Sequence, residues 1–225
     1  MATVPRHPEF PLSSLSSIRS GTSCLLTAGK KRLPMDQTPD AFAAALSSSD
    51  TDRVNRAIDT VEDLSVEKRA ALFNDCLERC RECYESNDGY QRQSAVRFIA
   101  SLYPRLAFRT VGAESPDEAL PDGWTLDEAA IHRQQLCEFY LTALVDDDGR
   151  VRRTAAKALK QLAVAAELIG ADDELQTILT ELETMAEDIN DEEVKKHVDQ
   201  AYGNVAFHAE KPGSLLPEGL RGSIE

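Results

Sequence analysis

The sequence predicts an all-α protein, an α-solenoid of about four antiparallel helix pairs. A polar or acidic turn followed by a helix with small or apolar residues at fixed offsets recurs four times, starting at Val54, Gln91, Val151 and Val194. The copy at Val54 is the weakest, and no segment shows the alternation typical of a strand. Because one helix pair cannot bury its apolar face alone, repeated pairs must stack on one another.

The first half of the repeat region contains clear helix signals. Thr38 predicts an N-cap, and Pro39 fits the first helical position, where its missing N–H costs nothing. We expect helices over about residues 38–46, 51–64 and 66–85, and a fourth that carries Ala95, Phe98, Ile99 and Leu102 and ends near Pro104. The third has one apolar stripe, formed by Val66, Ala70, Phe73, Leu77, Cys80 and Tyr84.

A loop separates the two halves. Residues 110–124 contain two prolines, two glycines and four acids. Thr125 and Glu128 then have the spacing of a capping box. Trp124 precedes this cap and is either an apolar staple against the helix near Ala129 or an anchor for a partner. Further helices are expected over about residues 126–145, 149–168, 172–187 and 191–208.

The clearest copy of the pattern resembles a known repeat. It begins with the turn Asp-Asp-Asp-Gly at Asp146 and continues as Val151-Arg-x-x-Ala-x-x-Ala-Leu. This resembles the second helix of a HEAT repeat, a family that consists mostly of scaffolds and adaptors, and the resemblance covers about residues 38–208. It implies that the second helices line a concave surface. It also implies that Arg152 meets Asp146 in a structural ladder, from which the copies at Asn55 and Lys195 depart.

Composition divides the chain into three parts. Residues 1–34 carry five bases and one acid and are rich in serine. They are an over-extended start before Met35, a disordered basic tail or an organellar transit segment, and none of these adds a folded element. Residues 35–208 form the expected repeat domain, and residues 209–225, with two prolines and three glycines, form an irregular tail.

The repeat domain is strongly acidic. Without the one acid and five bases of residues 1–34, the 39 acids and 25 bases of the chain become 38 and 20, so residues 35–225 have a net charge of −18. This excess of acids, with little lysine, is similar in composition to proteins of salt-loving archaea, although a mesophilic acidic scaffold fits as well. No apolar run approaches the roughly 18 residues that span a bilayer. We therefore expect a cytoplasmic protein that does not bind membranes.

Three cysteines have the spacing of an iron–sulfur motif. Cys76-x3-Cys80-x2-Cys83 matches the cluster-binding triad of radical S-adenosylmethionine enzymes, but it lies within a helical pattern and not in a loop. We expect buried thiols that pack as small apolar residues, while weak metal binding remains open. The odd total of five cysteines and the lack of a secretory signal favour a reducing compartment.

Other catalytic motifs are not found in the sequence. The four histidines include no His-Glu pair of the kind that binds iron in the HEAT-like deoxyhypusine hydroxylases. Gly-x-Ser-x-Gly and a glycine-rich phosphate loop are also missing. We therefore expect no catalytic residue, no cofactor, no metal and no small-molecule substrate, and we interpret the chain as not being an enzyme.

Superposing the four copies of the pattern aligns a row of basic residues. Offsets 2 and 6 from the starting residue contain no acid and five bases. Residues four apart share a helix face, so stacked repeats would align these cations in one stripe. The alternative is that they pair with neighbouring acids and only neutralise charge. The five residues are Arg56, Arg97, Arg153, Lys157 and Lys196.

The expected function is that of a non-catalytic scaffold. The basic row would bind a macromolecular partner, most simply an acidic protein, on the concave face. The alternative is a nucleic-acid-associated protein similar to the HEAT-like DNA alkylation-repair glycosylases, which also use a basic concave face. The net charge and the lack of stacking aromatics along the row argue against it. No residue supports a third possibility, a subunit similar to the HEAT-like bilin lyases.

Overall fold

The computed structural model shows an all-α fold and describes residues 35–86, 88–103, 120–121 and 123–210. The chain divides between Pro34 and Met35 into two units, and only the second contains described residues. In this part of the chain there are eight α-helices and no strand. The helices are α1 (Pro39–Leu46), α2 (Thr51–Glu62), α3 (Val66–Ser86), α4 (Gly89–Leu102), α5 (Leu126–Leu144), α6 (Gly149–Leu168), α7 (Asp172–Asp188) and α8 (Glu192–Ala209).

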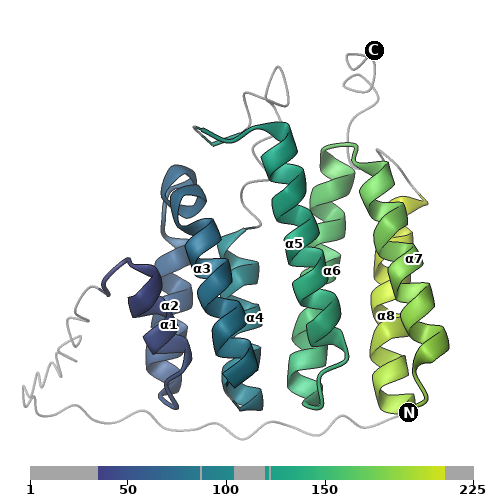
Figure 1. Ribbon diagram of the computed structural model, residues 1–225, viewed down its shortest axis with the longest axis horizontal. Helices are drawn as coiled ribbons and strands as arrows, with labels where there is room; N and C mark the ends of the chain where they lie inside the picture. Colours follow the sequence, from purple (N-terminus) through teal and green to yellow (C-terminus); the bar gives the residue numbers. More distant parts are fainter. Residues whose placement is uncertain (1–34, 87, 104–119, 122, 211–225) are drawn as a thin grey trace, which may run out of the picture. The chain divides into compact units, whose positions relative to one another are not determined.

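The helices pack in sequence order as four pairs, which confirms the predicted all-α, solenoid-like class. Each odd-numbered helix packs against the even-numbered helix that follows it. The even-numbered helices also pack side by side, α2 against α4, α4 against α6 and α6 against α8. The odd-numbered helices form the other layer, which lies in front in Figure 1. Equivalent positions of successive even-numbered helices are therefore neighbours in space.

An aspartate is the N-cap of every even-numbered helix. The side chains of Asp50, Asp88, Asp148 and Asp191 accept hydrogen bonds from main-chain N–H groups of the first turn. These contacts satisfy donors that have no partner inside the helix. Two predicted helix starts are confirmed, the N-cap at Thr38 with Pro39 in the first turn and the capping box of Thr125 and Glu128.

Small and apolar residues of the repeated pattern form the core. Val151, Ala155, Ala158 and Leu159 are each at most 2% exposed, because their offsets place them on the face of α6 that meets the other helices. The stripe of α3 is also mostly buried, and Phe73 is fully so.

One arginine ties three helices together. Arg69 of α3 is 1% exposed, and its guanidinium donates to the main-chain oxygens of Leu64, Ser101 and Glu62. Glu62 and Ser101 lie in the last turns of α2 and α4, where carbonyl groups have no partner inside the helix. The cation also suits the negative end of the helix dipole. The sequence analysis did not identify this residue, because its partners are main-chain atoms.

Gly89 and Gly203 are expected to respond to alanine in opposite directions. A Cβ atom at Gly89 would lie 2.0 Å from Asp148 Oδ2, so Gly89→Ala must displace the N-cap of α6. The free energy of unfolding should fall by about 1–2 kcal/mol. A Cβ at Gly203 of α8 meets no atom within 4 Å, so Gly203→Ala should raise it by about 0.5–1 kcal/mol. Urea denaturation followed by circular dichroism measures both changes, and equal changes would contradict the close contact.

Candidate partner-binding surface

The five cations of the predicted row lie on the even-numbered helices. Arg56 of α2 and Arg97 of α4 are half-buried, whereas Arg153 and Lys157 of α6 and Lys196 of α8 are exposed. The row is thus carried by one layer, and its most accessible part is on α6 and α8.

Two hydrogen bonds show how the row positions meet. Arg97 donates through Nη2 to Asn55 Oδ1 at 3.4 Å, which joins α4 to α2. Gln93 donates through Nε2 to Thr154 Oγ1 at 3.3 Å, which joins α4 to α6. Positions on this face of α2, α4 and α6 are therefore adjacent, as stacked repeats require. No described contact of this kind links Lys196 to α6.

These cations have few partners of their own. Among the described residues, none of the five forms an ion pair with an acid. Arg153 donates through Nε to the carbonyl of Gly149 in its own helix at 3.1 Å, and Arg56 Nε is buried without a hydrogen-bond partner. Charge neutralisation by direct pairing, the alternative to a binding role, is thus not observed in the described part of the molecule.

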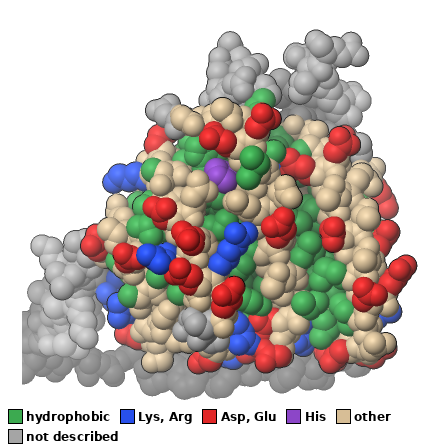
Figure 2. Space-filling view, viewed as in Figure 1, with side chains coloured by type: hydrophobic (Ala, Val, Ile, Leu, Met, Phe, Trp, Pro, Cys, Tyr) green, Lys and Arg blue, Asp and Glu red, His purple; other side chains and the backbone are tan. Residues whose placement is uncertain are grey.

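The opposite layer has a different charge. Figure 2 views the molecule from the side of the odd-numbered helices, where acidic side chains are spread over much of the face. Helix α7 illustrates this, with seven acids and no base in Asp172–Asp188. Helices α4 and α6 together contain seven bases and one acid, Glu167, which is 3% exposed and contacts His208. The positive charge of this acidic protein is therefore concentrated on one layer.

Comparisons with known proteins identify no family. No family model matches the chain, and no curated protein matches it. A solved structure with some likeness is the crystal structure of an engineered protein from the Northeast Structural Genomics Consortium, with a TM-score of 0.38 and 21% sequence identity. The match covers 76% of this chain and 63% of that chain. The likeness carries no argument about function, which must come from the surface itself.

Lys160 belongs to the same surface, although the sequence analysis missed it. It is exposed on α6, three residues after Lys157, and it has no described side-chain partner. Its offset of 9 from Val151 lies outside the offsets that define the row. The signal in the sequence was that the segment from Gly149 to Ala166 contains five bases and no acid.

The structural ladder differs in detail from the contact between Arg152 and Asp146 that the HEAT resemblance implies. Arg152 donates through Nη1 to the main-chain oxygens of Asp146 at 2.7 Å and Asp147 at 3.1 Å. The Asp146 carboxylate instead accepts two hydrogen bonds from Arg92 of α4, both at 2.8 Å, and one from Tyr84 of α3 at 2.5 Å. The ladder thus links one helix pair to the next, because Arg92 occupies in α4 the position that Arg152 occupies in α6.

The charge state of Asp146 follows from these contacts. Burial acts to raise the pKa of this carboxyl, but the hydrogen bonds from Arg92, Tyr84 and the N–H of Asp148 outweigh it and hold the pKa below its usual value. Asp148 is similar, because its hydrogen bond from Arg150 lowers its pKa to about 2. Both side chains are therefore ionised at neutral pH and fix the turn before α6.

The three cysteines of the iron–sulfur spacing lie in the core. Cys76, Cys80 and Cys83 are each at most 7% exposed on α3, and Cys83 Sγ lies 3.3 Å from Ser47 Oγ. Burial raises the pKa of Cys76 to about 12 and that of Cys80 well above its usual value, so both stay thiols. Among the described residues, no group of three or more His, Cys, Asp or Glu side chains is placed to hold a metal ion.

Trp124 is half-buried and packs against the core. Its ring lies 5.8 Å from that of Phe73 and 4.3 Å from that of His132, measured between centroids. His132 is 6% exposed, and burial lowers its pKa. These rings join α3 to α5, so Trp124 contributes to the junction between the second and third helix pairs.

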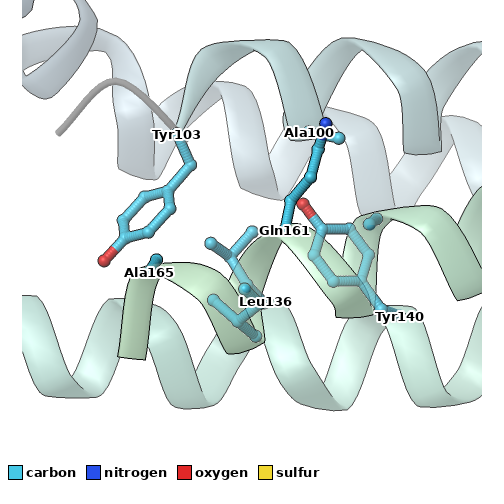
Figure 3. A pocket seen from close by; sticks show the side chains of 8 residues that line it. Ala100, Tyr103, Leu136, Tyr140, Gln161 and Ala165 are labelled. Atoms are coloured by element: carbon cyan, nitrogen blue, oxygen red, sulfur yellow. The ribbon is translucent and has the colours of Figure 1, made fainter. Parts of the chain in front are cut away.

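Two hollows lie near the helix pairs. One is a cavity of about 10 Å³ between α4, α5 and α6, where Figure 3 shows Tyr103 and Tyr140 on either side of Leu136. It has room for about one water molecule. The other is a recess of about 490 Å³ beside Tyr84, Arg92 and Asp146, whose polar atoms are already occupied by one another. In the described residues, no helix is long and apolar enough to cross a membrane.

Proposed function

We propose that this chain is a non-catalytic, HEAT-like scaffold of the cytoplasm that binds an acidic protein partner along the basic row. The observation that carries the proposal is the set of cations on neighbouring even-numbered helices that have no acidic partner among the described residues. Because residues 35–225 have a net charge of −18, cations without an acidic partner are available to an external carboxylate. No cofactor or metal is required for this role.

Charge is expected to steer the interaction, although each ion pair in it is weak. An exposed ion pair contributes about 0–1 kcal/mol, so a row of this size adds only a few kcal/mol. Complementary charge raises the association rate and selects acidic partners over others. Added salt must weaken the complex, because exposed charges are screened within about 10 Å at 0.1 M salt.

A protein partner fits better than a nucleic acid. Helices α4 and α6 present no exposed aromatic side chain on which a base could stack. The long-range field of an acidic domain repels a polyanion more strongly than it repels a short acidic segment. Nucleic-acid binding is therefore the competing outcome of the test below.

The test uses two double charge reversals with the same change in net charge. Arg153→Glu with Lys157→Glu alters the row, and Lys68→Glu with Arg79→Glu alters exposed cations of α3 in the other layer. The full tagged chain is used to purify its partner from the native source, and the purified partner is then titrated against each variant by calorimetry. Each of the two charge reversals removes one attraction and adds one repulsion, which gives four altered charge contacts. At about 0.5 kcal/mol each, they predict a dissociation constant about thirtyfold higher for the row variant.

The control variant should change the dissociation constant by less than about threefold. An unchanged affinity in the Arg153 and Lys157 variant would refute the role of the row. Tight binding of duplex DNA with a steep salt dependence, and no protein partner, would favour the nucleic-acid alternative. Circular dichroism spectra of both variants show whether the helices are intact.

A further inference from the structure

Helix α6 has a continuous basic ridge along its exposed face. Its exposed residues are Arg150, Arg153, Lys157, Lys160 and Gln161, and none is acidic. The only acid of the helix, Glu167, is buried. This ridge is the only helix face in the described residues where three cations without an acidic partner follow one another.

The spacing of the ridge is that of one helix face. Residues 150, 153, 157 and 160 are three, four and three apart, so their side chains lie in one line. At about 1.5 Å per residue, the line is about 15 Å long. Arg150 is paired with Asp148 at 2.6 Å, which leaves Arg153, Lys157 and Lys160 over about 10 Å of helix.

The ends of the predicted cross-repeat row are less favourable for an acidic ligand. Arg56 shares α2 with the exposed acids Asp52, Asp59 and Glu62, and its guanidinium is half-buried. On α8, Lys196 is preceded by the exposed Glu192 and Glu193. The unopposed positive charge therefore runs along α6 and not across the four repeats.

We infer that the bound element is an acidic α-helix of the partner protein, lying along α6 with carboxylates three and four residues apart. This inference rests on the proposed function and narrows it to one helix. A partner helix repeats side chains on one face with the same spacing and rise as α6 itself. An extended segment places same-face residues about 6.6 Å apart, so its third carboxylate would overshoot Lys160 by about 3 Å.

The flanks of the ridge allow a second helix to approach. Thr154 and Val164 lie beside the cations, are half-buried, and have short side chains. Gln161, which is exposed, adds a neutral hydrogen-bonding group. A short acidic helix also carries far less charge than a second copy of this chain, whose residues 35–225 have a net charge of −18 and repel those of the first copy.

The probe is a labelled, alanine-rich helical peptide of about 20 residues, long enough to be helical in water. In the first version the glutamates are spaced three and four apart on one face, and in the second the same residues are distributed around the helix. Duplex DNA is the third probe. Binding to the full chain is measured by fluorescence anisotropy at low and high salt.

The one-faced peptide should bind at least about fivefold tighter than the redistributed peptide, because more of its carboxylates meet α6 at once. Lys160→Glu should weaken its binding at least about fivefold, and by more than Lys196→Glu does. Lys68→Glu, on α3, is the control for the change in net charge.

The outcomes separate this inference from the proposed function. If Lys196→Glu and Arg56→Glu weaken peptide binding more than Lys160→Glu does, the ligand crosses the repeats, so the α6 inference fails and the basic row stands. If neither set matters, or duplex DNA binds tighter than both peptides, both proposals fail. Equal binding of the two peptides rejects the helical ligand. If the chain forms a dimer in sedimentation and Lys160→Glu dissociates that dimer, the occupant of the ridge is a second copy of the chain, and the inference of a partner helix fails.

Discussion

Replacing Phe73 with alanine is expected to lower the free energy of unfolding by about 3–5 kcal/mol. The ring is fully buried on α3 and contacts three others, at centroid distances of 5.4 Å to Tyr103, 5.8 Å to Trp124 and 4.7 Å to His132. These neighbours belong to α5 and to the segments next to α4 and α5, so the substitution would leave a cavity where three parts of the chain meet. Urea denaturation followed by far-ultraviolet circular dichroism measures the loss.

The same substitution at Phe207 is the matched control. That ring is 55% exposed on α8, so Phe207→Ala should cost less than about 1 kcal/mol. Fluorescence of Trp124, the single tryptophan of the chain, should also shift in Phe73→Ala, because one wall of its environment is lost. A loss below about 1 kcal/mol for Phe73→Ala would mean that this junction does not hold the second and third helix pairs together.

Replacing Asp146 with alanine is expected to cost about 2–4 kcal/mol. The Asp146 side chain is 4% exposed, and the substitution removes the acceptor of Arg92, Tyr84 and the N–H of Asp148. The Arg92 side chain, 20% exposed, would then lose a buried carboxylate while it keeps its charge and its ion pair with the exposed Asp147. The loss is measured by urea denaturation at neutral pH.

Asp147→Ala is the control, since Asp147 also pairs with Arg92 but its side chain is 86% exposed. It should cost less than about 1 kcal/mol. Equal losses in the two variants would contradict the importance of the buried carboxylate.

The contribution of Asp146 should disappear in acid. Because its pKa is lower in the folded than in the unfolded chain, its stabilisation is fully present above about pH 4 and is lost as the pH falls through the folded-state pKa. Asp148 acts in the same direction, with a pKa lowered to about 2. Stability of the wild type should therefore fall between about pH 4 and pH 2, and less steeply in Asp146→Ala.

Helix positions were predictable because their signals are local. The sequence predicted helices over about residues 149–168 and 191–208, and the structure has α6 at Gly149–Leu168 and α8 at Glu192–Ala209. Apolar spacing of three and four defines the buried face, and a capping residue such as Thr125 bonds within its own first turn. The predicted loop over residues 110–124 and the predicted segments 1–34 and 209–225 lie largely or wholly outside the described residues.

The candidate surface was only partly predictable. Offsets from Val151 correctly identified Arg153 and Lys157 as residues of one face, because residues four apart share it. They could not rank Arg56 below Lys160, since exposure depends on how α2 and α6 pack against their neighbours. Superposing repeats also favoured a stripe across helices, whereas the distribution of acids favours one along α6.

The sequence by itself determined eight helices, the caps at Thr38 and Thr125 and the faces that the helices bury, because these depend on residues within about one turn of each other. Only the tertiary structure decided that Asp146 is bound by Arg92, that Trp124 packs on Phe73 and that three cations of α6 have no acidic partner among the described residues. These contacts join residues more than 50 positions apart or depend on the exposure of a whole face. The register between packed helices sets them, and no local pattern in the chain encodes that register.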